Sequence, residues 1–239
     1  MVDMQPGDKR YNKNYIHHQK SAVLTALKEI VFGIEDGMVS TLGSITGIAI
    51  GSRDPHVVLL AGFVIVSVES ISMGIGSYLS NLSHKEVEQR KIAEEKEELE
   101  NYPEEEKEEL RMIYIKDGWP ETLAREMAEV AAKNPDLILK EMIKHELDIP
   151  LEDSSPALGG VFMFGAYILG GLIPLTAYVF LPINSALFVS IPLTLLGLFA
   201  LGSATTKFTK QNWFKASLRM LVLGGIALGV GVIAGILFK

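Results

Sequence analysis

No charged side chain occurs between Ser154 and Thr206, a run of 53 residues, and a second uncharged run of 19 residues extends from Met220 to Phe238. The helices of a soluble domain need a polar face toward water, and runs of this length leave no room for one. A helix crosses roughly 30 Å of hydrocarbon with about 20 apolar residues. The two runs therefore predict a membrane protein with several spans in its C-terminal part.

Five spans can be recognised from the distribution of apolar residues. The first is less apolar than the others because it contains two carboxylates, and a short Gly-Ser-Arg-Asp-Pro turn makes it antiparallel to the second. The spans are expected at about residues 30–50, 57–79, 157–180, 185–205 and 220–238. We therefore expect an all-α integral membrane protein with five transmembrane helices.

A hydrophilic segment, residues 84–153, separates the second span from the third and is called the insert below. It holds 22 of the 29 acidic residues of the chain against 11 basic ones, and it has few β-branched runs. We expect the second span to continue into it as one helix through Leu99, and proline-containing breaks to delimit three further helices. The chain then divides into a basic arm (1–29), spans one and two (30–83), the insert (84–153) and spans three to five (154–239).

The distribution of basic residues predicts the topology. If the N-terminal arm, the insert and the 207–219 loop share one side of the membrane, that side holds 20 of the 22 Lys and Arg residues, with Arg53 and Lys239 opposite. The positive-inside rule then places the N-terminus and the insert in the cytoplasm and the C-terminus outside. Cell membrane and organelle membrane both remain open as locations.

Composition also excludes several classes of function. The chain has no Cys, so it can form neither a disulfide nor a thiolate metal site. It has no basic patch with interleaved aromatic residues, so we do not expect a nucleic-acid partner. Any metal site must use carboxylate, Met sulfur, His or backbone oxygen.

Two carboxylates inside the predicted spans, Asp36 and Glu69, are the strongest indication of function. A carboxylate within the bilayer is costly, and such residues usually mark an ion path. Met73 lies four residues after Glu69 and therefore on the same helix face. A carboxylate with a thioether suits Fe²⁺ better than Mg²⁺ or Ca²⁺, which prefer oxygen ligands. A shallow, interfacial carboxylate and a Met that only packs are the alternatives.

The insert contains further potential ligands at helical spacing. Pairs of them, three or four residues apart, fall on three different expected helices, and helix bundles build di-metal carboxylate sites from such pairs. The pairs are Glu95 with Glu98, Glu106 with Glu109, and Met142 with Glu146. Acidic residues are so frequent here that this spacing also arises by chance, and spacing alone favours a solvated charged face.

Several strings, taken in order, resemble the vacuolar iron transporter family over most of the chain. The most specific is ESISMGIGSYLS in the second span, and the position of the insert between spans two and three also matches. The strings are VFGIEDGMVS (31–40), ESISMGIGSYLS (69–80), KEV (85–87), PEEE (103–106) and EMIKHEL (141–147).

The resemblance implies a fold and a function. Members of that family are five-span homodimers with the ion path between the two subunits. They move Fe²⁺, in some cases Mn²⁺, out of the cytosol, and proton antiport is the proposed driving force. We therefore expect metal ions, the lipid bilayer and a second copy of the chain as partners, and no prosthetic group. Fe²⁺ is the expected cargo, and Mn²⁺, Co²⁺ and Zn²⁺ are further candidates.

The resemblance also implies roles for individual residues. Asp36 and Met73, with Glu69 near them, would form the ion path. The metal-collecting set in the insert would be Glu95, Glu98, Glu106, Glu109, Met142 and Glu146. The chain departs from the family pattern at two positions: Ile143 stands where members often have Met, and Ser77 where they often have Glu. These departures leave metal affinity and metal preference open.

Two other classes of function fit the sequence less well. A membrane-anchored acidic module that only recruits basic partners would not need Asp36 and Met73 within its spans. An oxidase with a di-iron centre would need His beside its Glu ligands in a Glu-x-x-His pattern, and none occurs near Glu95 or Glu106. We therefore expect a transporter and not an enzyme.

Overall fold

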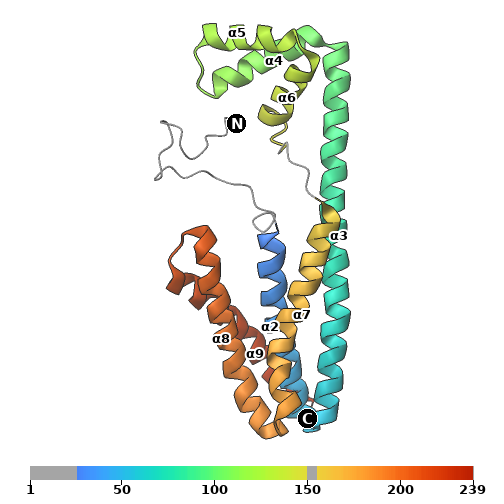
Figure 1. Ribbon diagram of the computed structural model, residues 1–239, viewed down its shortest axis with the longest axis vertical. Coiled ribbons are helices and arrows are strands. Elements are labelled where there is room, and N and C mark those ends of the chain that lie inside the picture. Colours follow the sequence, from blue (N-terminus) through green and yellow to red (C-terminus); the bar gives the residue numbers. More distant parts are fainter. Residues whose placement is uncertain (1–25, 150–154, 239) are drawn as a thin grey trace, which may run out of the picture.

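The computed structural model describes residues 26–149 and 155–238, and every regular element in these ranges is an α-helix, as predicted (Figure 1). Most of the arm expected at residues 1–29 lies outside the described residues. The helices are α2 (Leu27–Ser52), α3 (Pro55–Asn101), α4 (Pro103–Lys116), α5 (Glu121–Ala132), α6 (Pro135–His145), α7 (Pro156–Phe180), α8 (Ile183–Thr209) and α9 (Trp213–Leu237).

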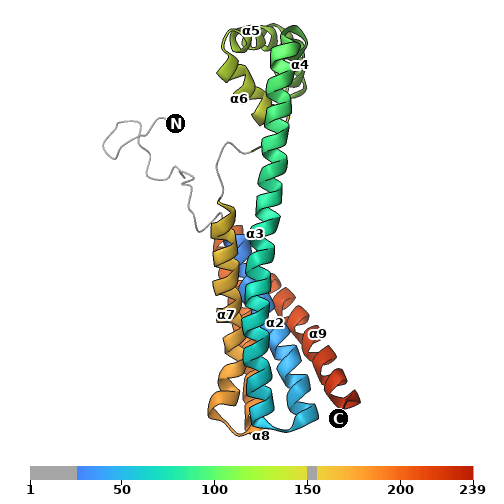
Figure 2. The ribbon, with the colours of Figure 1, turned by 90° about the vertical axis from the view of Figure 1, so that its right-hand side faces the viewer.

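Helices α2, α7, α8 and α9 form a bundle with the N-terminal part of α3 (Figures 1 and 2). Helix α2 packs against all four of the others. Its contact with α7 is especially close at Gly37, where a Cβ atom would overlap the carbonyl oxygen of Tyr167. Small residues allow this kind of close approach between membrane helices. The contact fixes the neighbouring Asp36 beside α7.

Helix α3 is continuous for 47 residues and leaves the bundle to reach the insert (Figure 2). Asp54 caps its N-terminus, accepting hydrogen bonds from the backbone N–H groups of His56 (2.8 Å) and Val57 (3.4 Å), and Pro55 occupies the first helical position. At 1.5 Å per residue, the helix is about 70 Å long. The expected continuation of the second span through Leu99 is confirmed, and the helix ends two residues later.

Four helices in the described part of the chain are long and apolar enough to cross a membrane: α3, α7, α8 and α9. Helix α2 has 26 residues but is not among them, and it carries Glu35 and Asp36 together with many Gly, Ser and Thr residues. It nevertheless lies among the other helices of the bundle. That α2 is a fifth span remains a prediction.

Helices α4, α5 and α6 pack on one another, and α4 and α6 also pack on α3. Pro103 is the first residue of α4, and the side chain of Asn134 caps α6 by accepting from the N–H groups of Asp136 (3.1 Å) and Leu137 (3.3 Å). Their shared core consists of Leu110, Tyr114, Ala124, Ala128, Ala131, Ile138 and Met142. This core brings the end of α6 and the start of α4 next to α3.

Candidate metal centre

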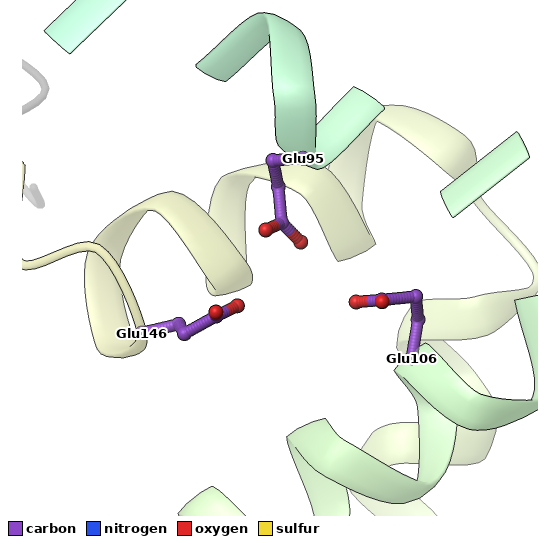
Figure 3. Close-up of side chains that lie close together, drawn as sticks. All are labelled: Glu95, Glu106 and Glu146. Atoms are coloured by element: carbon purple, nitrogen blue, oxygen red, sulfur yellow. The ribbon is translucent and has the colours of Figure 1, made fainter. Parts of the chain in front are cut away.

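Three glutamates from three different parts of the insert meet at one point (Figure 3). Glu95 comes from α3, Glu106 from α4, and Glu146 directly follows α6. Each offers one carboxylate oxygen, and these oxygens lie within 4.8 Å of one another. We call these residues the glutamate triad. Its members are far apart in the sequence, so the triad exists only when the insert is folded.

Two members of the triad are unusually buried for acidic residues. Glu95 is 1% exposed and Glu106 7% exposed, whereas Glu146 is exposed to solvent. The Oε1 atom of Glu95 is buried and has no hydrogen-bond partner. A buried polar atom without a partner is destabilising, and each such atom in a native protein calls for an explanation, such as an ion. The donor set, all carboxylate oxygen, is chemically suited to a divalent cation.

The triad also holds its protons more tightly than ordinary carboxyl groups do. Burial, followed by the negative charges of Glu146 and Glu106, raises the pKa of Glu95 to about 8. Partial burial of the carboxyl group, followed by the charge of Glu109, raises the pKa of both Glu106 and the more exposed Glu146. A cation must displace protons to bind carboxylates. If the triad bound a cation at neutral pH, it would therefore have to release a proton.

The other three residues of the predicted collecting set do not belong to the triad. Glu98 and Glu109 are exposed, but their charges act on Glu106 and Glu146, so they lie near it. Met142 is fully buried in the core of the insert, in the same cluster as Leu110. That these three bind metal remains a prediction.

In the bundle, Asp36 on α2 and Glu69 on α3 lie close enough for their charges to interact. Asp36 is half-buried and Glu69 is exposed, while Met73, one turn further along α3, is half-buried. The structure thus brings together the two carboxylates that the sequence placed in separate spans. Their role in an ion path remains a prediction.

A tyrosine that the sequence did not single out lies beside these carboxylates. The hydroxyl of Tyr167 on α7 is 2.7 Å from Oγ of Ser40, and Ser40 donates its own proton to the carbonyl oxygen of Asp36 (2.6 Å). Tyr167 is therefore the donor to Ser40. It is fully buried, and the charges of Asp36 and Glu69 reach its hydroxyl. A single Tyr in an apolar span produces no periodic pattern in the sequence. The only indication of its role is that a buried tyrosine hydroxyl needs a hydrogen-bond partner.

Comparison with known proteins places these features in a family context. The family model described as the VIT family matches residues 27–236. Vacuolar iron transporter 1 of Eucalyptus grandis is 32% identical over 227 residues, which cover 93% of this chain and 91% of that protein. Vacuolar iron transporter 1 of Tulipa gesneriana is 29% identical, with coverages of 88% and 87%. The vacuolar iron transporter of Plasmodium falciparum is 30% identical, with coverages of 89% and 82%. The matched region includes both the bundle and the insert.

Proposed function

The chain belongs to the VIT family, and on that premise we propose that it is a membrane transporter that carries Fe²⁺ out of the cytosol. Mn²⁺, Co²⁺ and Zn²⁺ are further candidate ions. The observation that most directly supports a divalent cation as the cargo is the glutamate triad, with its buried, unpartnered oxygen on Glu95. The transporters named among its relatives support the same proposal.

In this proposal the insert lies in the cytoplasm and collects the ion. Fe²⁺ would bind the oxygens of the triad and release the protons that the raised pKa values hold there. Glu98 and Glu109 would add negative charge at the rim, which attracts cations to the site. Met142 lies in the apolar core of the insert, so its part in the collecting set stays a prediction.

The ion path would run through the bundle along Asp36, Glu69 and Met73. Glu69 is exposed on α3, and the apolar side chains of Val68 and Ile71 in the same stretch of the helix are exposed too. In a single copy of the chain, this carboxylate would face hydrocarbon, which is strongly unfavourable. A second copy packed against α3 would cover it with protein. We therefore propose a homodimer with the path at its interface and α2 as the fifth span.

Proton antiport is the proposed driving force. Asp36 and Glu69 must lose protons to bind a cation, so protons and metal compete for the same groups. A proton gradient across the membrane would then favour metal release on the acidic side. With the N-terminus cytoplasmic and the C-terminus outside, the ion moves away from the insert.

Flux measurements on proteoliposomes test the proposal. Wild-type protein should take up Fe²⁺ when a pH gradient is imposed, and Asp36→Asn, which keeps the side-chain shape but removes the charge, should abolish uptake while the dimer persists. Glu94→Gln, on the exposed surface of the insert, is the control and should transport normally. Unchanged flux in Asp36→Asn would refute the role of Asp36. Absence of flux for Fe²⁺, Mn²⁺, Co²⁺ and Zn²⁺ in the wild type would favour the membrane-anchored interaction module.

A further inference from the structure

Four basic residues cluster where α8 ends and α9 begins, and among the described residues none of them has an acidic partner. Lys207, Lys210, Lys215 and Arg219 are all exposed, and none of them forms an ion pair with any residue in the described ranges 26–149 and 155–238. No Asp or Glu occurs in the sequence from Ser154 to Lys239. We call residues 207–219 the basic hairpin. No acidic side chain in the described part of the chain neutralises its positive charge.

The backbone of the basic hairpin is firmly held. Just before and within it, Ser203 and Ser217 share a hydrogen bond of 2.8 Å between their Oγ atoms. Gly202 packs so closely on α9 that a Cβ atom would lie 2.6 Å from Cα of Ser217. Asn212 caps α9 by accepting from the N–H groups of Phe214 (3.0 Å) and Lys215 (3.3 Å). The basic side chains therefore extend from fixed positions, with Lys215 and Arg219 on one face of α9.

Aromatic residues indicate where the basic hairpin lies relative to the membrane. Trp213 and Phe214 are exposed at the start of α9, and Trp213 makes edge-to-face contacts with both Phe199 (6.1 Å between ring centroids) and Phe214 (5.8 Å). Aromatic residues concentrate at the level of lipid headgroups. Helices α8 and α9, both apolar enough to cross a membrane, meet here. Figure 1 shows this turn at the same end of the bundle as the start of α2, on the side of the insert.

We propose that the basic hairpin binds the phosphate-bearing headgroups of anionic phospholipids in the leaflet on the insert side. Four cations without ion-pair partners at headgroup depth are complementary to anionic lipid, and each contributes about fivefold to the affinity. The acidic insert is the competing partner within the chain, but no insert carboxylate pairs with these cations in the described residues. The proposal concerns lipid binding and does not depend on transport.

The test uses the full-length protein, purified in detergent and mixed with equal amounts of phosphatidylglycerol and phosphatidylcholine. Bound lipids are counted by native mass spectrometry. The test variant is Lys207→Gln/Lys210→Gln/Lys215→Gln/Arg219→Gln. The matched control removes four exposed cations from the insert: Lys116→Gln/Lys133→Gln/Lys140→Gln/Lys144→Gln. Both variants change the net charge equally, so only the place of the change differs.

Wild type and control should retain phosphatidylglycerol in preference to phosphatidylcholine, and the hairpin variant should lose this preference by about tenfold or more. An excess of inorganic phosphate should not displace the lipid. Equal retention by wild type and hairpin variant, or an equal loss in the control, would overturn the proposal. Displacement by phosphate would also overturn it, by identifying a site for the free anion. If the wild type showed no preference for phosphatidylglycerol over phosphatidylcholine, the proposal would be overturned. The basic hairpin would then be better explained as a partner of the acidic insert.

Discussion

Glu95 and Glu146 place carboxylate oxygens within 4.8 Å of each other, although one residue lies near the C-terminal end of α3 and the other follows α6. The charge of Glu146 is the largest cause, after burial, of the raised pKa of Glu95. Two like charges at this distance repel each other unless a proton or a cation lies between them. Repulsion between Glu95 and Glu146 would therefore lower the stability of the metal-free insert, and a bound cation would remove that repulsion.

The first prediction concerns metal affinity. Glu95→Gln removes the charge of the most buried triad member and keeps its size, so it should weaken Mn²⁺ binding by about 10- to 100-fold, as loss of a metal-site interaction typically does. Isothermal calorimetry on the full-length protein in detergent measures this. Glu100→Gln, an exposed residue of the same helix, is the control and should bind as wild type does. Equal affinity in Glu95→Gln and wild type would contradict the assignment of the triad as a metal centre.

The second prediction concerns stability against pH without metal. The pKa of Glu95 is about 8 in the folded protein and 4.5 for the free side chain, so the folded state binds more protons between these values. Stability should therefore fall as pH rises from about 4.5 to about 8 and change little above that. Glu106 and Glu146, whose pKa values are also raised, contribute with the same sign.

Glu95→Gln should remove part of this slope because glutamine does not ionise. At pH 8 the metal-free variant should be more stable than wild type by at least ~1 kcal/mol, since each unit of raised pKa corresponds to about 1.4 kcal/mol. Thermal unfolding in detergent between pH 5 and pH 9 measures both proteins. Parallel curves for the two would show that Glu95 is not the group that titrates.

The third prediction compares two buried tyrosines of α7. Tyr167→Phe removes the donor to Ser40 and should cost about 1 kcal/mol of stability. The hydroxyl of Tyr178 is buried without a hydrogen-bond partner, so Tyr178→Phe should be neutral or stabilising. Thermal unfolding of the two variants under one condition provides the comparison. If Tyr178→Phe destabilised the protein as much as Tyr167→Phe, the hydrogen bond to Ser40 would not be the cause.

The fourth prediction concerns the contact between α2 and α7. Gly37→Ala places a methyl group against the carbonyl oxygen of Tyr167, so the helices must move apart, at a cost of about 1–3 kcal/mol. Because Asp36 is the neighbouring residue, metal flux should fall as well. Gly165→Ala on α7 adds a methyl group where no atom lies within 4 Å, and it should stabilise its helix by about 0.5–1 kcal/mol. Equal behaviour of the two variants would argue against the close contact.

The breaks between the helices of the insert could be predicted because local chemistry decides where these helices begin and end. Pro103 begins α4, Gly118 adopts a positive φ of 98° in the break before α5, and Asn134 caps α6. These signals act over a few residues and are visible in the sequence. The continuity of α3 was predictable for the same reason: no proline or glycine interrupts the chain between Gly76 and Pro103.

The meeting of Glu95, Glu106 and Glu146 could not be derived from spacing, because it depends on how α4 and α6 pack against α3. Helical spacing treated Glu98 and Glu109 as equal to Glu95 and Glu106, whereas the structure buries only the latter two. It also treated Met142 as a partner of Glu146, but its side chain belongs to the apolar core. The first expected span shows a related effect: Glu35 and Asp36 lower the hydropathy of α2, while contacts with four other helices hold it in the bundle.

The unbroken course of α3 limits how an ion could move between the glutamate triad and the carboxylates of the bundle. Glu69 and Glu95 are 26 residues apart on one helix, which corresponds to about 39 Å along its axis. Because α3 has no break between these two residues, it cannot fold back to bring Glu95 close to Glu69. An ion released by the triad would have to diffuse through water over that distance, so the insert would serve as a reservoir that raises the local ion supply and not as a direct relay.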